Sequence, residues 1–231
     1  MTNTTRSLIL LIFSCLSFIF ASAQHANSFV GIRFGSVLPM GQFASHEFGK
    51  GGYALLGKSL GGEAVWFINP KLGLGVDFSS NQFEFASGYY AEDYQQSDPA
   101  FKSVDVLSTP YKLKTYMGGA YYKVSITGKL NSTFKIMGGL MTARTPNQLY
   151  GVDTYLAGKI TFWKTSAYDS KITFLTGASL EYRLYDKVSL LLQADFSYAE
   201  MAFTYITGSS RYINYMQMPV FSLQPGINIH F

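Results

Sequence analysis

The sequence predicts an all-β fold, a transmembrane antiparallel up-and-down β-barrel of about eight strands that follows a cleaved signal peptide. The first observation is that apolar and polar residues alternate in segment after segment, which is the side-chain period of a strand. The second is composition: aromatic residues make up 16% and charged residues only 14% of the chain, whereas roughly a quarter of an ordinary soluble domain is charged. The third is that short and long connections alternate, as they do in transmembrane barrels.

The first 23 residues predict an export signal. Arg6 precedes a short apolar stretch, and Ala21-Ser22-Ala23 provides the small residues at which signal peptidase cleaves. The stretch is short for a membrane anchor, and apolar residues continue past Cys15, which argues against a lipidated cysteine. We therefore expect a signal peptide over residues 1–23, export through the Sec pathway, and a mature barrel domain over residues 24–231 that contains no cysteine.

The alternating segments number about eight, and most are roughly 10 to 13 residues long. A tilted membrane strand needs about 9 to 11 residues, whereas strands of soluble proteins are usually about five or six residues long. The segments are 28–38, 55–68, 72–81, 115–127, 133–141, 172–184, 188–198 and 221–231. Residues 152–163 alternate as well, so a ten-stranded barrel is the alternative.

The connections between these segments fall into two classes. Short turns are expected near residues 69–71, 128–132 and 185–187, and long loops near residues 39–53, 86–111, 144–170 and 200–213. In transmembrane barrels the short turns face the periplasm and the long loops face the outside. The sequence therefore predicts which end of the barrel lies outside the cell.

The polar faces of the segments predict what fills the barrel. They carry four basic and four acidic residues, many small residues and almost no large aliphatic residues. The charged residues are Arg33, Glu63, Asp77, Lys123, Lys135, Glu181, Arg183 and Asp195. Because an unpaired buried charge costs several kcal/mol, a soluble core would not be built this way. We expect these groups to pair inside the barrel as a polar plug, while the apolar faces contact lipid.

Aromatic residues near the strand ends predict contacts with the membrane interfaces. They are Trp66, Tyr122, Tyr182 and Tyr198. Tyrosine and tryptophan gather at both interfaces of membrane proteins because their rings are amphipathic. The alternative is that they take part in ordinary aromatic packing.

The sequence offers little evidence of catalysis. Of its three histidines, His25 and His230 lie near the ends of the mature chain, and only His46 lies in a predicted outer loop. The motif around His46 reads SHEFG, which lacks the second histidine of a metalloprotease helix. We expect His46 and Glu47 to be a polar loop pair, and we expect no catalytic residue, no metal site and no cofactor. The net charge of +4 is too small to indicate a nucleic-acid partner.

Three motifs carry a resemblance to a known family. The terminal GINIHF, the hairpin WFINPKLGLGVDFSS and the segment GSVLPMGQF resemble those of outer-membrane β-barrels of the OmpA/OmpX type, including PorT-like proteins. The resemblance implies a location in the bacterial outer membrane, contact with its lipid and lipopolysaccharide, and delivery by the barrel-assembly machinery. The assembly signal would comprise Ile227, Ile229 and Phe231. Pro225 departs from the pattern, because it removes a ladder donor and predicts a bulge or a local break.

If the protein recognises a specific ligand, the long loops are where we expect the binding residues to lie. Tyrosines and acids cluster in residues 86–111, and residues 144–170 are long enough to form a hairpin, so a protein or glycan ligand is expected there. The sequence favours a non-enzymatic barrel with a structural or surface-interaction role. The alternatives are an adhesin-like or ligand-docking barrel, a PorT-like secretion component and, remotely, a lipid A-modifying enzyme.

Overall fold

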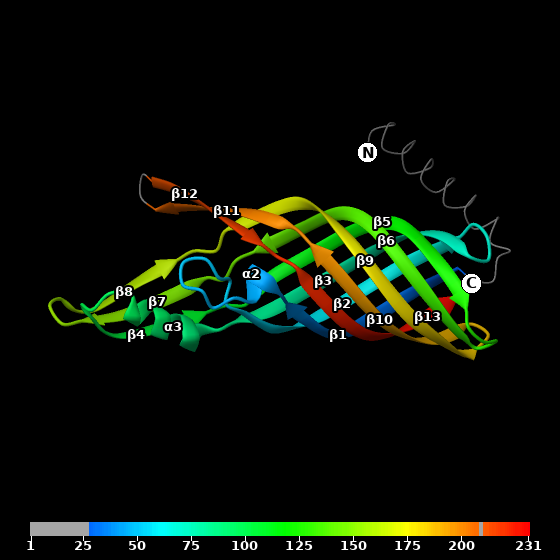
Figure 1. Ribbon diagram of the computed structural model, residues 1–231, viewed down its shortest axis with the longest axis horizontal. Helices are drawn as coiled ribbons and strands as arrows, with labels where there is room; N and C mark the ends of the chain where they lie inside the picture. The colour runs from blue at the N-terminus through cyan, green and yellow to red at the C-terminus, as the bar shows by residue number, and fades with distance from the viewer. Residues whose placement is uncertain (1–27, 208–209) are drawn as a thin grey trace, which may run out of the picture.

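Eight long antiparallel strands close into a barrel (Figure 1). The computed structural model describes residues 28–207 and 210–231, and the predicted signal peptide lies outside these residues. The barrel strands are β1 (Phe29–Pro39), β2 (Ala54–Phe67), β3 (Leu72–Phe85), β5 (Tyr111–Ser125), β6 (Leu130–Arg144), β9 (Tyr168–Tyr185), β10 (Val188–Tyr198) and β13 (Val220–His230). Each strand pairs with its neighbour in the chain order of these eight, and β1 pairs with β13 to complete the ring. The predicted fold class is confirmed.

The long connections fold into structure of their own at one end of the barrel. They form a three-stranded sheet of β4 (Phe101–Ser108), β7 (Gln148–Thr154) and β8 (Gly158–Lys164), a hairpin of β11 (Glu200–Thr207) and β12 (Ser210–Gln217), and the helices α2 (Gly41–Ala44) and α3 (Ser87–Gln96). We call these elements the outer extension. Figure 1 shows them at the end opposite the C-terminus and the short turns.

Two expectations are corrected by the outer extension. The alternation in residues 152–163 is real, but β7 and β8 pair with β4 outside the barrel, so the ten-stranded alternative is wrong. The stretch 86–111 is not a loop, because it contains α3 and β4. Helix α3 packs against β4 and buries Ala91, which supplies the tertiary contacts that a short helix needs.

The outward side chains of the barrel form an apolar belt. Ile136 is 74% and Ile172 is 84% exposed in the isolated chain. The belt ends toward the outer extension at a polar row in which Lys58, Gln82, Lys112 and Arg144 are successive partners across β2, β3, β5 and β6. A closed barrel with this exterior is buried by hydrocarbon, because the backbone groups of its wall are paired between strands except at the break beside Pro225.

The lumen is filled by side chains in layers. The layer next to the outer extension is apolar and comprises Phe43, Leu113, Met141, Met201 and other buried residues. Below it lie the buried charges, and a second apolar group includes Phe29 and Phe67 at the turn end. The expectation that the polar faces carry almost no large aliphatic residues is therefore wrong: Met117, Met137 and Leu175 face the lumen from the alternating segments. In the outer layer, β11, β12 and α2 add apolar residues from outside those segments.

Glycines in the wall make room for the buried charges. A methyl group on Gly177 would collide with the carboxylate of Asp195, and one on Gly61 would lie 3.0 Å from the guanidinium carbon of Arg33. At both positions a side chain would face the lumen, where a narrow barrel has the least space. By contrast, a methyl group on Gly138 would meet no atom within 4 Å.

Pro225 interrupts one ladder without changing its register. On the β1 side, Arg33 pairs with Gly226 and Ser36 with Leu223, while the two positions between them are unpaired. On the other side, Leu192 pairs with Pro225 in an unbroken ladder. Of the two alternatives predicted at Pro225, a bulge or a local break, the structure shows the local break.

Candidate functional site

The centre of the lumen holds five charged side chains in mutual contact. Lys135 Nζ lies 2.7 Å from Asp77 Oδ2, 3.2 Å from Asp195 Oδ2 and 3.5 Å from Glu63 Oε2. Arg33 Nη2 donates to Asp77 Oδ2 at 2.5 Å, and Arg33 Nη1 lies 3.6 Å from Glu63. All five are almost fully buried. We call this group the central ion cluster, and it crosses the lumen from β1 to β6 and β10.

A second charged group lies nearer the short turns. His230 Nε2 lies 3.0 Å from Glu181 Oε1, and Lys123 Nζ lies 3.9 Å from the same oxygen. Among the residues that the structure describes, Arg183 has no ion pair and is only half-buried. His230 was absent from the predicted network although it lies on the polar face of the last strand, so the alternation alone could have placed it there.

The second group contains a serine, a histidine and a carboxylate, but it is not arranged as a catalytic triad. Ser189 Oγ lies 2.8 Å from His230 Nε2, and Glu181 approaches the same nitrogen. In a triad the acid orients the histidine through Nδ1, so that Nε2 is free to take the proton of the nucleophile. Here Nδ1 has no partner in the described part of the chain. All three side chains are also almost fully buried.

No other arrangement in the described residues suggests chemistry. Across residues 28–207 and 210–231, no three histidine, cysteine or carboxylate side chains gather as metal ligands. None of the helices described is long and apolar enough to cross a membrane. His46 is stacked between the rings of Tyr53 and Tyr89, with centroids 5.2 and 4.9 Å away, whereas Glu47 pairs with Lys50 at 2.6 Å. The expected His46–Glu47 pair is therefore replaced by an aromatic stack.

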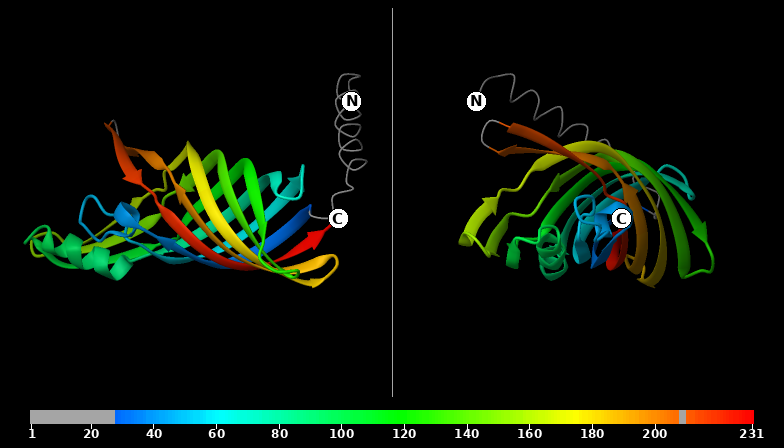
Figure 2. Two further views of the ribbon diagram at one scale, coloured as in Figure 1. Left: turned by 45° about the vertical axis from the view of Figure 1, so that its right-hand side comes forward. Right: turned by 60° about the vertical axis from the view of Figure 1, so that its left-hand side comes forward.

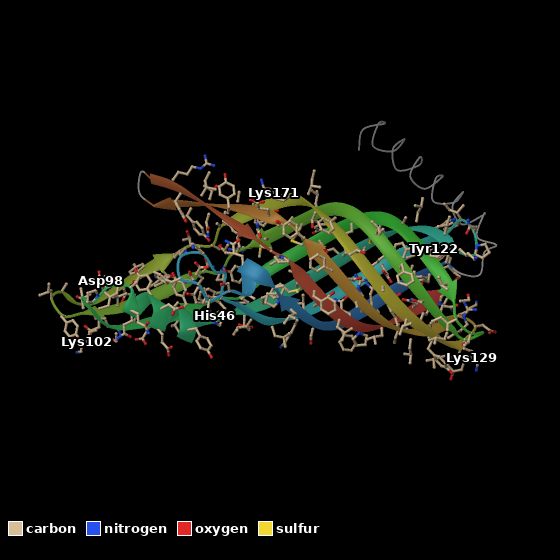
Figure 3. All side chains as sticks on the ribbon, in the orientation of Figure 1. His46, Asp98, Lys102, Tyr122, Lys129 and Lys171 are labelled. Atoms are coloured by element: carbon tan, nitrogen blue, oxygen red, sulfur yellow. The ribbon has the colours of Figure 1, made fainter. Side chains whose placement is uncertain are left out.

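The predicted interface aromatics lie at two levels. Trp66, Tyr122 and Tyr182 occupy the ends of β2, β5 and β9 near the short turns, where Figure 3 labels Tyr122. Tyr198 ends β10 near the outer extension. The side chains of Tyr122 and Tyr182 are exposed on the apolar belt. Their role at the membrane interfaces stays a prediction.

The C-terminal residues of the predicted assembly signal lie on the same exterior. Ile227 and Ile229 belong to β13 and point outward, and Phe231 follows the strand with an exposed ring. Their recognition by the assembly machinery likewise stays a prediction.

An aromatic cleft lined by the outer extension has a volume of about 480 Å³. Figure 2 shows the β11–β12 hairpin diverging from the β7–β8 hairpin, and side chains from both hairpins and from α3 line the cleft. The lining residues are Tyr90, Tyr94, Tyr150, Phe162, Trp163, Lys164, Thr165, Tyr205 and Tyr212. We call it the aromatic cleft. Sequence reasoning pointed to residues 86–111 and 144–170, but Tyr205 and Tyr212 come from a third connection.

The floor of the aromatic cleft is packed, whereas the side chains of its walls are exposed. Tyr150 is buried and stacked on Phe162 with centroids 4.8 Å apart and planes 5° apart. Trp163 is 70% and Tyr212 is 60% exposed. All seven residues of β8 are exposed because it is an edge strand that α3 does not cover. The exposed rings of Trp163 and Tyr212 therefore stand beside packed aromatic residues, and no other element of the described chain covers them.

The aromatic cleft has few polar groups, and three of them make specific contacts within the chain. The ammonium of Lys164 lies over the ring of Tyr205, 4.9 Å from its centroid, and Tyr205 donates to Thr145 Oγ1 at 3.2 Å. Tyr150 donates to Gln148 Oε1 at 2.9 Å. Burial raises the pKa of Tyr150 and Tyr205, so both phenols stay protonated at neutral pH. The cleft thus combines aromatic faces with neutral hydroxyls and one cation.

The fold and the distribution of side chains define the class. A closed eight-stranded antiparallel barrel, an apolar outer belt and an outer extension opposite the short turns make this chain a transmembrane β-barrel of the bacterial outer-membrane type.

Comparison with solved structures finds similarity to outer-membrane proteins at low sequence identity. Neisserial surface protein A (NspA) is 15% identical, with 88% of this chain and 97% of that chain covered and a TM-score of 0.49. Ail, the attachment invasion locus protein of Yersinia pestis, is 12% identical, with 88% and 97% covered and a TM-score of 0.45. A major outer membrane protein from Thermus thermophilus is 12% identical, with 87% and 99% covered and a TM-score of 0.49. No family model and no curated protein matches the sequence.

Proposed function

We propose that this protein is a non-enzymatic, non-conducting outer-membrane barrel that recognises a glycan at the cell surface through the aromatic cleft. The observation that carries the proposal is the cleft itself: exposed rings of Trp163 and Tyr212 stand on a packed aromatic floor at the outer end of the barrel. Binding sites are typically concave and mostly apolar, with a few fixed polar groups.

A saccharide suits this surface for a physical reason. The faces of aromatic rings carry negative partial charge, and they attract the C–H groups on the flat side of a pyranose ring. The hydroxyl of Tyr90 and the ammonium of Lys164 line the same cleft and can hydrogen-bond to the hydroxyl groups at the edge of such a ring. The cation of Lys164 argues against a cationic ligand and is compatible with a neutral or acidic sugar.

The filled lumen supports the absence of a channel. The central ion cluster joins β1, β2, β3, β6 and β10 through direct contacts across the interior. An apolar layer of methionines and aromatic residues lies above it. We expect the purified protein to give no large, steady openings in a planar bilayer, and such openings would contradict this part of the proposal.

Intrinsic fluorescence offers the direct test of glycan binding. The chain has two tryptophans, so Trp66→Phe leaves Trp163 of the cleft as the only one. Chitotetraose, maltotetraose and cellotetraose are titrated into this variant in detergent, and a saturable change in emission is expected with at least one of them. Tyr212→Ala should weaken that binding about fivefold, because an aromatic contact contributes about 1 kcal/mol.

Tyr155→Ala is the matched control, since Tyr155 is an exposed tyrosine of the outer extension that does not line the cleft. Its affinity should equal that of the parent. If none of the three oligosaccharides changes the emission, or if Tyr155→Ala weakens binding as much as Tyr212→Ala, a glycan site in the cleft is refuted.

A further inference from the structure

The three short turns share one design at the periplasmic end. Lys71, Lys129 and Lys187 each stand directly before a strand, at the start of β3, β6 and β10. The backbone carbonyl of each accepts a hydrogen bond from the adjacent strand at 2.7 to 2.8 Å. All three side chains are exposed. The equivalent placement fixes three cations on the rim, and Figure 3 labels Lys129 at this end.

Two of these turns enclose a cleft. Its volume is about 710 Å³, and its lining includes Lys129, Arg183, Tyr185, Asp186 and Lys187. Three of these residues are basic and one is acidic, so the cleft carries excess positive charge. We call it the turn cleft.

A β-bulge shapes one wall of the turn cleft. Val188 pairs with Tyr185, but the next residue, Ser189, pairs with Arg183, so Leu184 is an extra residue in β9. Bulges bend a strand and redirect its side chains. Arg183 Nε is buried and has no hydrogen-bond partner in the described part of the chain, although a buried donor of this kind is ordinarily satisfied.

The turn cleft also borders the apolar belt. Leu184 lines it and is exposed next to Tyr182, which ends the belt on β9. A molecule bound there therefore has an anion-binding surface on one side and hydrocarbon on the other. The guanidinium of Arg183 and the ammonium groups of Lys129 and Lys187 line the cleft, and these are the groups that proteins use to bind phosphate.

We propose that the turn cleft binds the phosphate of an anionic phospholipid in the periplasmic leaflet, with Arg183, Lys129 and Lys187 around the headgroup and the acyl chains along Leu184. This site is independent of the aromatic cleft, which lies at the other end of the barrel. Basic residues near an anionic membrane surface each strengthen binding about fivefold.

Native mass spectrometry of the folded, detergent-solubilised protein tests the proposal. The protein is incubated with equimolar phosphatidylglycerol and phosphatidylcholine of equal chain length, and the two singly lipid-bound species are compared. We expect phosphatidylglycerol to be favoured at least tenfold. The triple variant Lys129→Gln, Arg183→Gln, Lys187→Gln should bring the ratio close to one, and each single variant should lower it severalfold.

Two controls separate the turn cleft from general charge effects. Lys71→Gln removes the equivalent cation on the same rim but outside the cleft, and it should leave the ratio unchanged. A triple variant of exposed lysines on the outer extension, Lys50, Lys102 and Lys159 to glutamine, removes the same number of charges and should also leave it unchanged. Folding of every variant is verified by its faster electrophoretic migration without boiling.

Several results would overturn the proposal. One is equal retention of the two lipids by the parent protein, and another is an equal loss of selectivity in the Lys71 variant and the cleft variants. Displacement of phosphatidylglycerol by millimolar inorganic phosphate would show that the cleft holds free phosphate and not a lipid. If the triple variant does not fold, the single variants decide the outcome.

Discussion

Replacement of Lys135 by methionine is the sharpest test of the buried network. Lys135 is the one cation that contacts all three carboxylates of the central ion cluster, at 2.7, 3.2 and 3.5 Å. Methionine has a similar length and no charge, so the change leaves Asp77, Asp195 and Glu63 with Arg33 alone. The cluster then holds three acids against one base in a closed space.

The expected cost follows from these distances. At an effective dielectric constant of about 20, two unit charges 2.7 Å apart attract each other by about 6 kcal/mol. Desolvation of the ammonium, which costs several kcal/mol, opposes this attraction in the parent protein. Removing one partner of a buried ion group typically costs about 3 to 5 kcal/mol, because the other charges stay buried. We expect Lys135→Met to lower the free energy of unfolding by that amount.

Equilibrium unfolding in urea measures this change, with the protein folded into lipid vesicles and followed in both directions by fluorescence and electrophoretic migration. Adding Asp195→Asn to Lys135→Met removes one surplus acid, and the double variant should regain a substantial part of the loss. Lys50→Met breaks an exposed pair with Glu47 and should leave the unfolding curve unchanged. The reasoning is refuted if Lys135→Met also unfolds like the parent, or if Asp195→Asn deepens its loss.

Three further predictions concern other parts of the chain. Burial, together with a 2.5 Å hydrogen bond to Asp93, raises the pKa of Tyr53. Because the folded state then holds this proton more tightly than the unfolded state, the stabilisation is present at neutral pH and is lost as pH rises above about 10. Alkaline hydrogen exchange of the outer extension should show this loss of stability in the parent and not in Tyr53→Phe. Gly177→Ala should lower the free energy of unfolding by about 1 to 3 kcal/mol in the same urea assay, whereas Gly138→Ala should have little effect because its methyl group meets no atom. Replacing residues 148–164 by a short turn should abolish the aromatic cleft and leave the heat-modifiable barrel intact, since β7 and β8 pair only with β4 and with each other; loss of heat modifiability would show that the sheet is required for closure.

The barrel could be predicted because the side chains of each wall strand alternate between the lipid and the lumen, so every second residue has the same polarity. Ile32, Arg33 and Phe34 already show one face in lipid and the other in the lumen. The same period assigned Lys135 and Asp195 to the interior, where they meet. The alternation does not specify which strand pairs with which, however, so β7 and β8 could not be distinguished from barrel strands.

The outer extension could not be derived in the same way. Helix α3 has the sequence SGYYAEDYQQ, which shows little apolar periodicity and is stabilised by packing against β4. The aromatic cleft joins Tyr90, Tyr150 and Tyr212, which are distant in sequence. Arg183 was assigned to the interior by alternation, yet the bulge at Leu184 and the end of the strand leave it without an ion pair in the described chain. Local patterns do not encode these juxtapositions.

The pairing of β1 with β13 has a consequence for biogenesis. The first and last strands form a seam that Arg33 and Gln224 bridge with a hydrogen bond of 2.6 Å. Without β13, one edge of β1 and one edge of β10 lack their partner, so the observed ring cannot close until the last dozen residues are in place. A chain that ends before Val220 is therefore expected to expose two strand edges, which are prone to pair with other chains and aggregate.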